Sequence, residues 1–97
     1  MTTKKTREVL ENAIQHYGVK FQIDKAIEEL VELLNELCRC KTGRENVENI
    51  TEEMADVTIV LWELGLIFAN NERLSEEIEY KLDRLQSRIK RDRKRQC

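Results

Sequence analysis

Residues that break helices are scarce in this chain of 97 amino acids. It contains no proline and only three glycines, and these two residue types fit the interior of a helix least well. Their scarcity excludes collagen-like and proline-rich disordered chains, and it speaks against a β-sandwich, whose many turns need them. The composition therefore predicts an all-α fold with long helices, in one domain that covers residues 1–97.

Long apolar runs and paired cysteines are also absent. No run of about 18 apolar residues occurs, so we expect no transmembrane helix and no membrane partner. The first residues, MTTKKTREVLENAIQ, lack the apolar segment of a secretory signal. The three cysteines are Cys38, Cys40 and Cys97, and the first two stand too close for an ordinary zinc pair. We expect reduced thiols and a cytoplasmic protein.

The net charge of −2 hides a gradient along the chain. Residues 81–97 contain eight Lys or Arg against two Asp, a balance of +6, so the first 80 residues carry −8. A basic end of this kind is typical of a segment that meets a polyanion, or of a solvated helix end. Nucleic acid is not the expected partner, because the acidic remainder would repel it and no recognition motif occurs. We expect residues 91–97 to fray.

Apolar residues recur at helical spacing in four segments. The first two span about residues 3–17 and 21–41, the third begins near residues 44–46 and ends at about Phe68, and the fourth begins after Asn70-Asn71. Ser75 is a candidate N-cap for the fourth helix. Because the connections are short, we expect consecutive helices to pack antiparallel, as in a four-helix bundle.

The second and third segments carry heptad seams, in which apolar residues alternate at spacings of four and three. The seams are Ile23, Ile27, Leu30, Leu34 and Leu37, and then Ile50, Met54, Val57, Leu61, Leu64 and Phe68. The third segment is apolar nearly all round, which predicts a helix at the centre of the assembly. A chain of this size buries only about 60–65% of its unfolded surface. We therefore expect a homodimer or homotetramer that completes the core.

Acidic residues stand at the edges of these apolar faces. Glu53 and Asp56 lie one turn apart on the third helix, and Glu29 and Glu32 have the same spacing on the second. An ionised carboxylate is costly to bury without compensation. If the two helices are antiparallel neighbours, the acid pairs face each other, with Lys25 as the nearby base. Such an all-oxygen set suits Mg²⁺, or Mn²⁺ as a substitute, better than zinc or copper.

Two short motifs carry a resemblance to a known family. The string EELVE at residues 28–32, followed after twenty residues by EMAD at 53–56, resembles the EExxE…ExxD signature of the all-α NTP pyrophosphohydrolases, the MazG-like superfamily. Residues 25–27, the apolar run 57–61 and the stretch YKLDRL at 80–85 are also similar, the last to small phage-type members. The resemblance implies a MazG-like bundle that cleaves a nucleoside triphosphate between its α- and β-phosphates, with Mg²⁺ as cofactor.

Roles for individual residues follow from the resemblance. The implied metal ligands are Glu29, Glu32, Glu53 and Asp56, and the candidate catalytic bases are Glu28 and Glu32. The candidate substrate-binding residues are Lys25, Lys81, Arg84 and Trp62, with Phe21 and Tyr17 as further candidates for contact with the base. Many relatives have a Lys-Asn arrangement near the phosphates, whereas here Asp83 and Arg84 follow Lys81, which leaves the phosphate-binding set open.

Other classes of protein compete with this interpretation. The heptad seams would also suit a helical-bundle or coiled-coil interaction protein without enzymatic activity. A nucleic-acid-binding protein that uses the basic end is a second alternative. A ferritin-like di-iron bundle needs Glu-x-x-His pairs, and the one histidine, His16, follows Ala13 at that spacing, which excludes this class.

Overall fold

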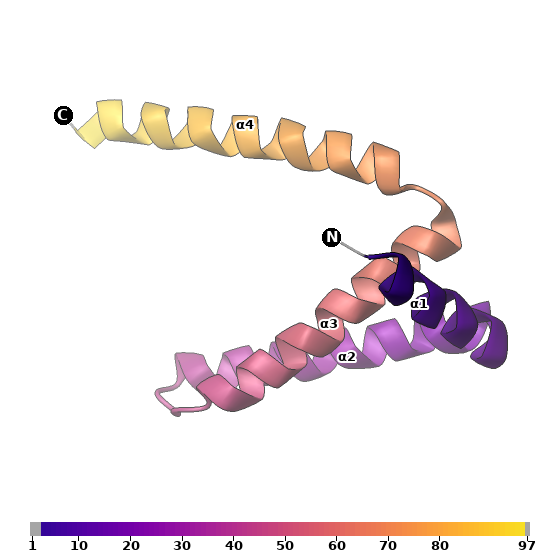
Figure 1. Ribbon diagram of the computed structural model, residues 1–97. Helices are drawn as coiled ribbons and strands as arrows, with labels where there is room; N and C mark the ends of the chain where they lie inside the picture. The colour runs from indigo at the N-terminus through magenta and orange to yellow at the C-terminus, as the bar shows by residue number, and fades with distance from the viewer. Residues whose placement is uncertain (1–2, 97) are drawn as a thin grey trace.

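A computed structural model describes residues 3–96 of the chain, and this part is entirely helical, without strands (Figure 1). The helices are α1 (Lys4–Tyr17), α2 (Val19–Lys41), α3 (Val47–Phe68) and α4 (Asn71–Gln96). The prediction of four helices is confirmed. No helix in this part of the chain is both long and apolar enough to cross a membrane.

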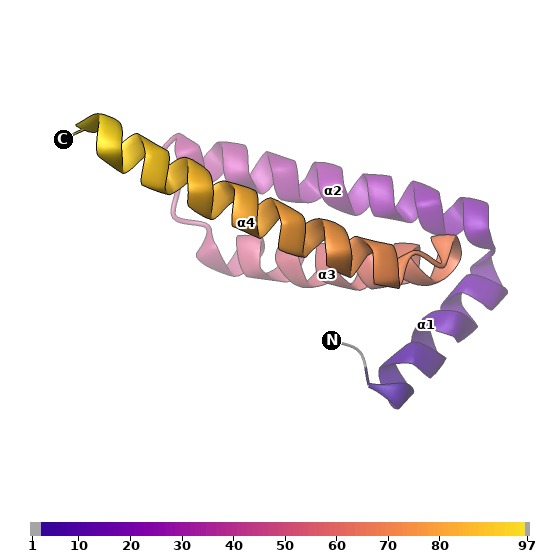
Figure 2. The same ribbon diagram turned by 90° about the horizontal axis from the view of Figure 1, so that it is seen from above.

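Helix α1 begins and ends at residues suited to those positions. The Thr3 hydroxyl caps it by accepting a hydrogen bond from the backbone N–H of Thr6. Gly18 follows the last residue with φ of 91°, a conformation that glycine adopts without strain. The chain turns at Gly18 and enters α2 at once, so α1 lies at an angle to α2 (Figure 2). The predicted antiparallel packing of these two helices is therefore wrong.

Helices α2 and α3 form an antiparallel hairpin, as predicted for this pair (Figures 1 and 2). Asn46, just before α3, fixes their connection. Its side-chain amide donates to the backbone carbonyl of Glu36 and to Glu36 Oε2, both at 2.9 Å. The Glu36 Oε1 atom accepts from Arg39 at 2.6 Å, so the buried Glu36 carboxylate is fully partnered.

The two helices of the hairpin face each other through unexpected residues. The buried positions are Gln22, Ala26, Glu29 and Glu36 on α2, and Val57, Val60, Glu63 and Gly65 on α3. Most of the heptad seam lies outside: Leu34, Leu61 and Met54 are 57%, 50% and 54% exposed. A single chain does not surround α3 on most sides, so its place at the centre of an assembly stays a prediction. Polar side chains therefore share the interior of the hairpin with Ala26, Val57 and Val60, while most leucines of the seams lie on its outer surface.

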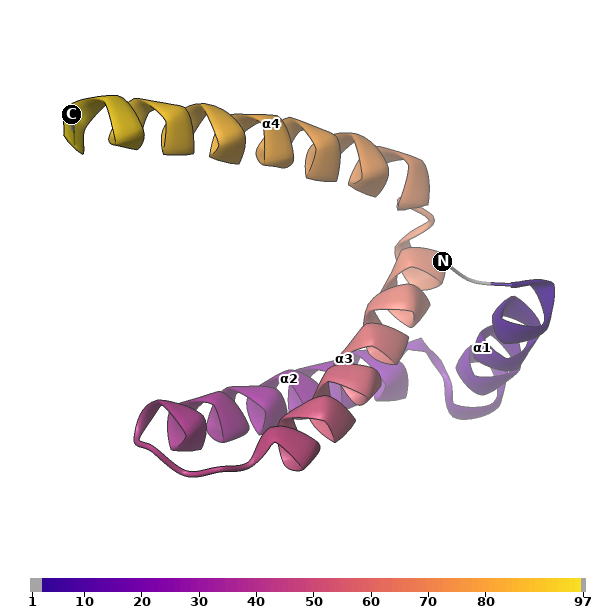
Figure 3. The ribbon, with the colours of Figure 1, turned by 60° about the vertical axis from the view of Figure 1, so that its left-hand side comes forward.

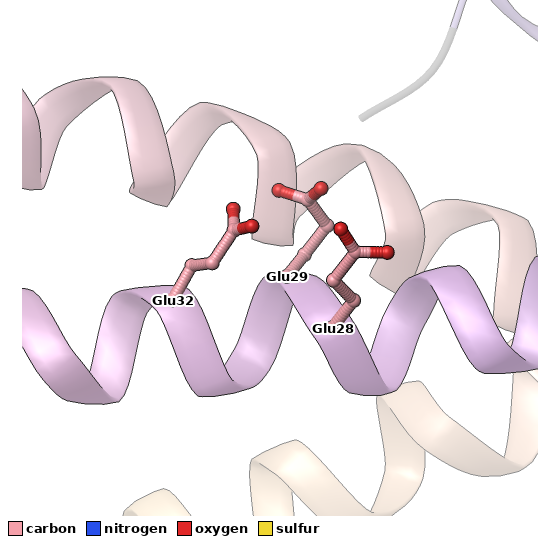
Figure 4. Close-up of side chains that lie close together, drawn as sticks. All are labelled: Glu28, Glu29 and Glu32. Atoms are coloured by element: carbon pink, nitrogen blue, oxygen red, sulfur yellow. The ribbon is translucent and has the colours of Figure 1, made fainter.

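Both seams lie on one side of the hairpin. Viewed along each helix axis from its N-terminus, the seam is rotated by about a quarter turn from the positions that face the other helix. The rotation has the same sense on α2 and on α3. Because the helices are antiparallel, equal rotations bring the two seams to the same side. On α2 the seam is roughly opposite Glu28 and Glu32, and Figure 4 shows these two carboxylates pointing away from α4. The hairpin therefore has an apolar face on the side of α4 and a carboxylate face on the other.

Helix α4 stands apart from the hairpin (Figures 1 and 3). Its backbone approaches only that of α3, near their connection, and none of its residues is buried. Ala69 ends α3 in a left-handed conformation, and the N–H of Leu74 donates to the carbonyl of Asn70. Helix α4 thus begins at Asn71 and includes Ser75, so the predicted N-cap at Ser75 is wrong.

Two further expectations about α4 differ from the structure. The helix continues to Gln96, through residues where we expected fraying, while Cys97 lies outside the described residues. It also does not pack along α3, so the described part of a single chain is a hairpin with two attached helices rather than a closed four-helix bundle.

Candidate metal centre

Carboxylates from both helices of the hairpin meet on its carboxylate face. Glu29 of α2 and Glu53 and Asp56 of α3 each place a carboxylate oxygen within 4.8 Å of the others. Glu28, Glu29 and Glu32 form a second such group along α2 (Figure 4). The antiparallel hairpin therefore brings together the two acid pairs that the sequence places on adjoining helices, and Glu29 belongs to both groups.

Two oxygens in this cluster are buried without a hydrogen-bond partner among the described residues. They are the Oε2 atoms of Glu29 and Glu53. Glu29 is only 5% exposed, whereas Asp56 and Glu28 are open to solvent. Glu36, equally buried on the same helix, has partners for both oxygens. Because an unpaired buried acceptor is destabilising, a proton or a cation at Oε2 would stabilise the Glu29 carboxylate.

Lys25 is the basic residue that the structure places at the cluster. Its ammonium lies 3.2 Å from Oε1 of Glu29 and 4.0 Å from Oε2 of Glu28. The hydrogen bond to Glu29, and then the charge of Glu28, raise the pKa of Lys25. One ammonium faces five carboxylates, so the cluster keeps a strong negative charge that would attract a divalent cation.

Mutual repulsion and burial also act on the acids themselves. Burial raises the pKa of Glu29, the Lys25 hydrogen bond opposes that shift, and the charges of Asp56 and Glu32 add to it. Burial likewise raises the pKa of Glu53, and Glu32 raises it further. By contrast, the hydrogen bond from Asn46 lowers the pKa of Glu36. Glu29 and Glu53 are thus in an environment that disfavours their charge, which is typical of functional sites.

A hollow of about 240 Å³ adjoins the cluster. Glu29 and Asp56 line one part of it, and Tyr17, Phe21, Gln22 and Glu63 line another. The rings of Tyr17 and Phe21 are stacked, with centroids 5.0 Å apart and planes 19° from parallel. Of the aromatic residues considered from the sequence, Tyr17 and Phe21 therefore lie beside the carboxylates.

A buried polar pair that was not predicted from the sequence lies in the same hollow. The Gln22 amide donates to Oε2 of Glu63, and the two residues are 6% and 8% exposed. Burial raises the pKa of Glu63, and the hydrogen bond from Gln22 opposes the shift. A signal was available: Gln22 precedes Glu29 by one heptad and Glu63 follows Asp56 by one heptad, so each pair shares a helix face.

Three residues predicted to bind substrate lie elsewhere in the chain. Trp62 lines a separate hollow of about 370 Å³ with Leu10, Leu74 and Ile78. Lys81 and Arg84 are exposed on α4, on the side of the hairpin away from the carboxylates. Within one chain, the structure therefore brings together the acids, Lys25 and two aromatic residues, but not the proposed phosphate clamp or Trp62.

Comparison of the chain with protein-family models, with curated proteins and with solved structures found no match. The donor set of the site consists of carboxylate oxygens on two helices, which fits the preference of Mg²⁺ and Mn²⁺ for oxygen ligands.

Proposed function

We propose that the protein is a Mg²⁺-dependent nucleoside triphosphate pyrophosphohydrolase, which converts a (d)NTP to a (d)NMP and pyrophosphate. One observation carries this proposal: buried Glu29, with an unpartnered oxygen, lies within 4.8 Å of carboxylates from both helices. The motif spacing supports it, because the residues of EELVE and EMAD that meet in space are those that the MazG-like resemblance implies as ligands.

Glu29, Glu53 and Asp56, with Glu32 beside them, would hold the cation. When bound, Mg²⁺ would neutralise the carboxylates, bind phosphate oxygens and stabilise charge on the departing pyrophosphate. Glu28 is exposed and Glu32 half-buried at the solvent side of the cluster, where either carboxylate can accept a proton from water. Water attacks the α-phosphorus, the bond to the bridging oxygen breaks, and pyrophosphate leaves.

The hollow next to the cluster would receive the nucleoside. Gln22 and Glu63 each stand seven residues, or about 10 Å of helix, from Glu29 and Asp56 respectively. A ribose and a base can bridge that length, with the stacked rings of Tyr17 and Phe21 as an apolar wall. The Gln22–Glu63 pair presents donors and acceptors that can bind the edge of the base.

The exposed seams support the expectation of a homodimer or homotetramer. Among residues 3–96, twenty large apolar side chains are exposed, including Leu30, Leu34 and Leu37 of α2, and a surface of this kind marks an interface. Exposed, unbonded Cys38 and Cys40 suit a cytoplasmic, reducing compartment.

Glu53 and Glu52 offer a matched test, because they are neighbours of the same type and only Glu53 belongs to the cluster. Pyrophosphate release from a panel of NTPs and dNTPs is measured with Mg²⁺ for wild type, Glu53→Gln and Glu52→Gln. We expect Glu53→Gln to lose at least about 100-fold in rate and Glu52→Gln to retain wild-type turnover. Unchanged turnover in Glu53→Gln with intact helicity, or no pyrophosphate from any substrate, would overturn the proposal.

A helical interaction protein without enzymatic activity is the second candidate, and the exposed apolar seams favour it. It differs in its response to metal. A plain bundle should melt at the same temperature with and without Mg²⁺, whereas a cation bound only by the folded state stabilises it.

A further inference from the structure

The apolar face of the hairpin requires a covering surface of matching length. It extends along both helices, from Ile27 to Leu37 on α2 and over Met54 and Leu61 on α3, and each of these four side chains is about half exposed. An identical face on a second copy has the same length and the same seam spacing. Seam against seam, the two hairpins would form a four-helix core with knobs-into-holes packing.

Helix α4 runs along the side of the hairpin that this second copy would occupy (Figures 1 and 3). Its own apolar stripe consists of Leu74, Ile78, Leu82, Leu85 and Ile89, all at least 42% exposed. Leu74 and Ile78 face Trp62 across the separate hollow at the connection. Beyond these two residues, no other described helix lies beside the stripe, because the backbone of α4 does not approach α1, α2 or the rest of α3.

The two faces of the hairpin determine what α4 would meet. In the second copy, the apolar face of the hairpin would pack against the apolar face of the first hairpin. Its carboxylate face would then point away from the first hairpin and toward α4 of the first copy. Along one flank of the α4 stripe stand Lys81, Arg84 and Arg88, at spacings of three and four. The carboxylate face that they would meet carries Glu28, Glu32 and Asp56. Positive and negative surfaces would thus be opposed, which favours this pairing over a mismatched one.

We propose that two copies of this chain associate through their apolar faces, and that α4 of each copy covers the carboxylate face of the other. Lys81 and Arg84 then complete the site of the partner copy, which explains why a single chain keeps them away from its own acids. The assignment of the two residues to the phosphates rests on the proposed function, whereas the arrangement of the two copies does not.

Cross-linking tests the arrangement without any activity. Copies labelled with ¹⁴N and ¹⁵N are mixed, allowed to exchange, and treated with a carbodiimide that joins contacting amines and carboxylates. We expect links between α4 lysines and Glu28 or Glu32 to join a light copy to a heavy one. Lys81→Arg, which keeps the charge but not the amine, should lose the Lys81 link alone. Links within one copy only, or a monomer by light scattering, would overturn the proposal.

Leu34→Glu places a charge in the apolar face and should abolish both association and the links between copies. If that variant is not helical by circular dichroism, Lys81→Glu with Arg84→Glu serves instead. These exposed positions lie outside the seams, so the double variant should still dimerise but lose the links from α4. A dimer that keeps all of these links would contradict the proposed position of α4.

Complementation between two inactive variants tests whether Lys81 and Arg84 contribute to the site of the partner copy. Glu53→Gln and the double variant Lys81→Ala, Arg84→Ala should each lose pyrophosphate release. Mixed after exchange, half of the dimers contain one copy of each, with one intact site of two, so about a quarter of wild-type activity should return. No recovery from two inactive variants would overturn the contribution in trans. Links between copies without activity in any preparation would instead contradict the proposed enzyme and leave the arrangement standing.

Discussion

Asp56→Asn should make the metal-free protein more stable and remove its response to Mg²⁺. The Asp56 carboxylate lies within 4.8 Å of that of Glu29, and Asp56 is solvent-exposed. No salt bridge joins Asp56 to a described basic residue. Two like charges at that distance repel by about 0.9 kcal/mol at the dielectric constant of water. Asparagine removes this repulsion and breaks no ion pair.

The size of the effect can be expressed as a change in melting temperature. For a domain of this length, 1 kcal/mol corresponds to about 4–8 °C, so Asp56→Asn should melt about 4–7 °C above wild type in EDTA. Mg²⁺ at one hundred times its dissociation constant should stabilise wild type by about 2.7 kcal/mol, or about 10 °C or more. The variant should gain little, so the order of stability reverses when metal is added.

The assay is thermal unfolding followed by far-ultraviolet circular dichroism, at one protein concentration because association also affects stability. Glu52→Gln is the control: it removes one charge from the same helix, outside both carboxylate groups. It should respond to Mg²⁺ as wild type does. If the melting temperatures of Asp56→Asn and wild type rise equally with Mg²⁺, the carboxylate cluster does not bind the cation and the proposed metal site is wrong.

Two further predictions concern protonation and substrate preference. Because the pKa values of Glu29 and Glu53 are raised above 4.5, the folded state holds protons that the unfolded chain releases. The melting temperature in EDTA should therefore rise as the pH falls from neutral toward 4.5. A decrease over that range would contradict the raised pKa values of Glu29 and Glu53. Glu63→Gln should change the ranking of kcat/KM among bases and leave the Mg²⁺-induced shift in melting temperature unchanged. An equal loss for every base would instead assign Glu63 a structural role.

The helices and the meeting of the acids could be predicted from local rules. The absence of proline and the regular apolar spacing predicted α2 and α3 nearly to their ends, and Gly18 separates α1 from α2 as a helix-terminating glycine should. The spacing of Glu29, Glu53 and Asp56, with a short connection, brought them to one face. These features depend on the geometry of a single helix or of one antiparallel pair.

The placement of α4 and the role of the seams could not be predicted in the same way. Periodicity shows that a face is apolar but not which surface covers it. The third helix was therefore placed at the centre of the assembly, although one chain leaves Met54, Leu61 and Phe68 of its seam exposed. Gln22 and Glu63 were missed for a related reason. Polar residues on a helix normally face solvent, and only the opposing helix makes these two a buried pair.

The partly polar interior of the α2–α3 hairpin separates two demands that usually compete within one core. In the proposed dimer, leucines on the outer face would determine the strength of association, while polar residues between the helices would form the proposed site. If the hollow receives the proposed substrate, substitutions at Gln22, Tyr17 or Phe21 should change substrate preference and leave the association of the copies intact. In such a scaffold, ligand specificity and the stability of the assembly would depend on different sets of residues and could be engineered separately.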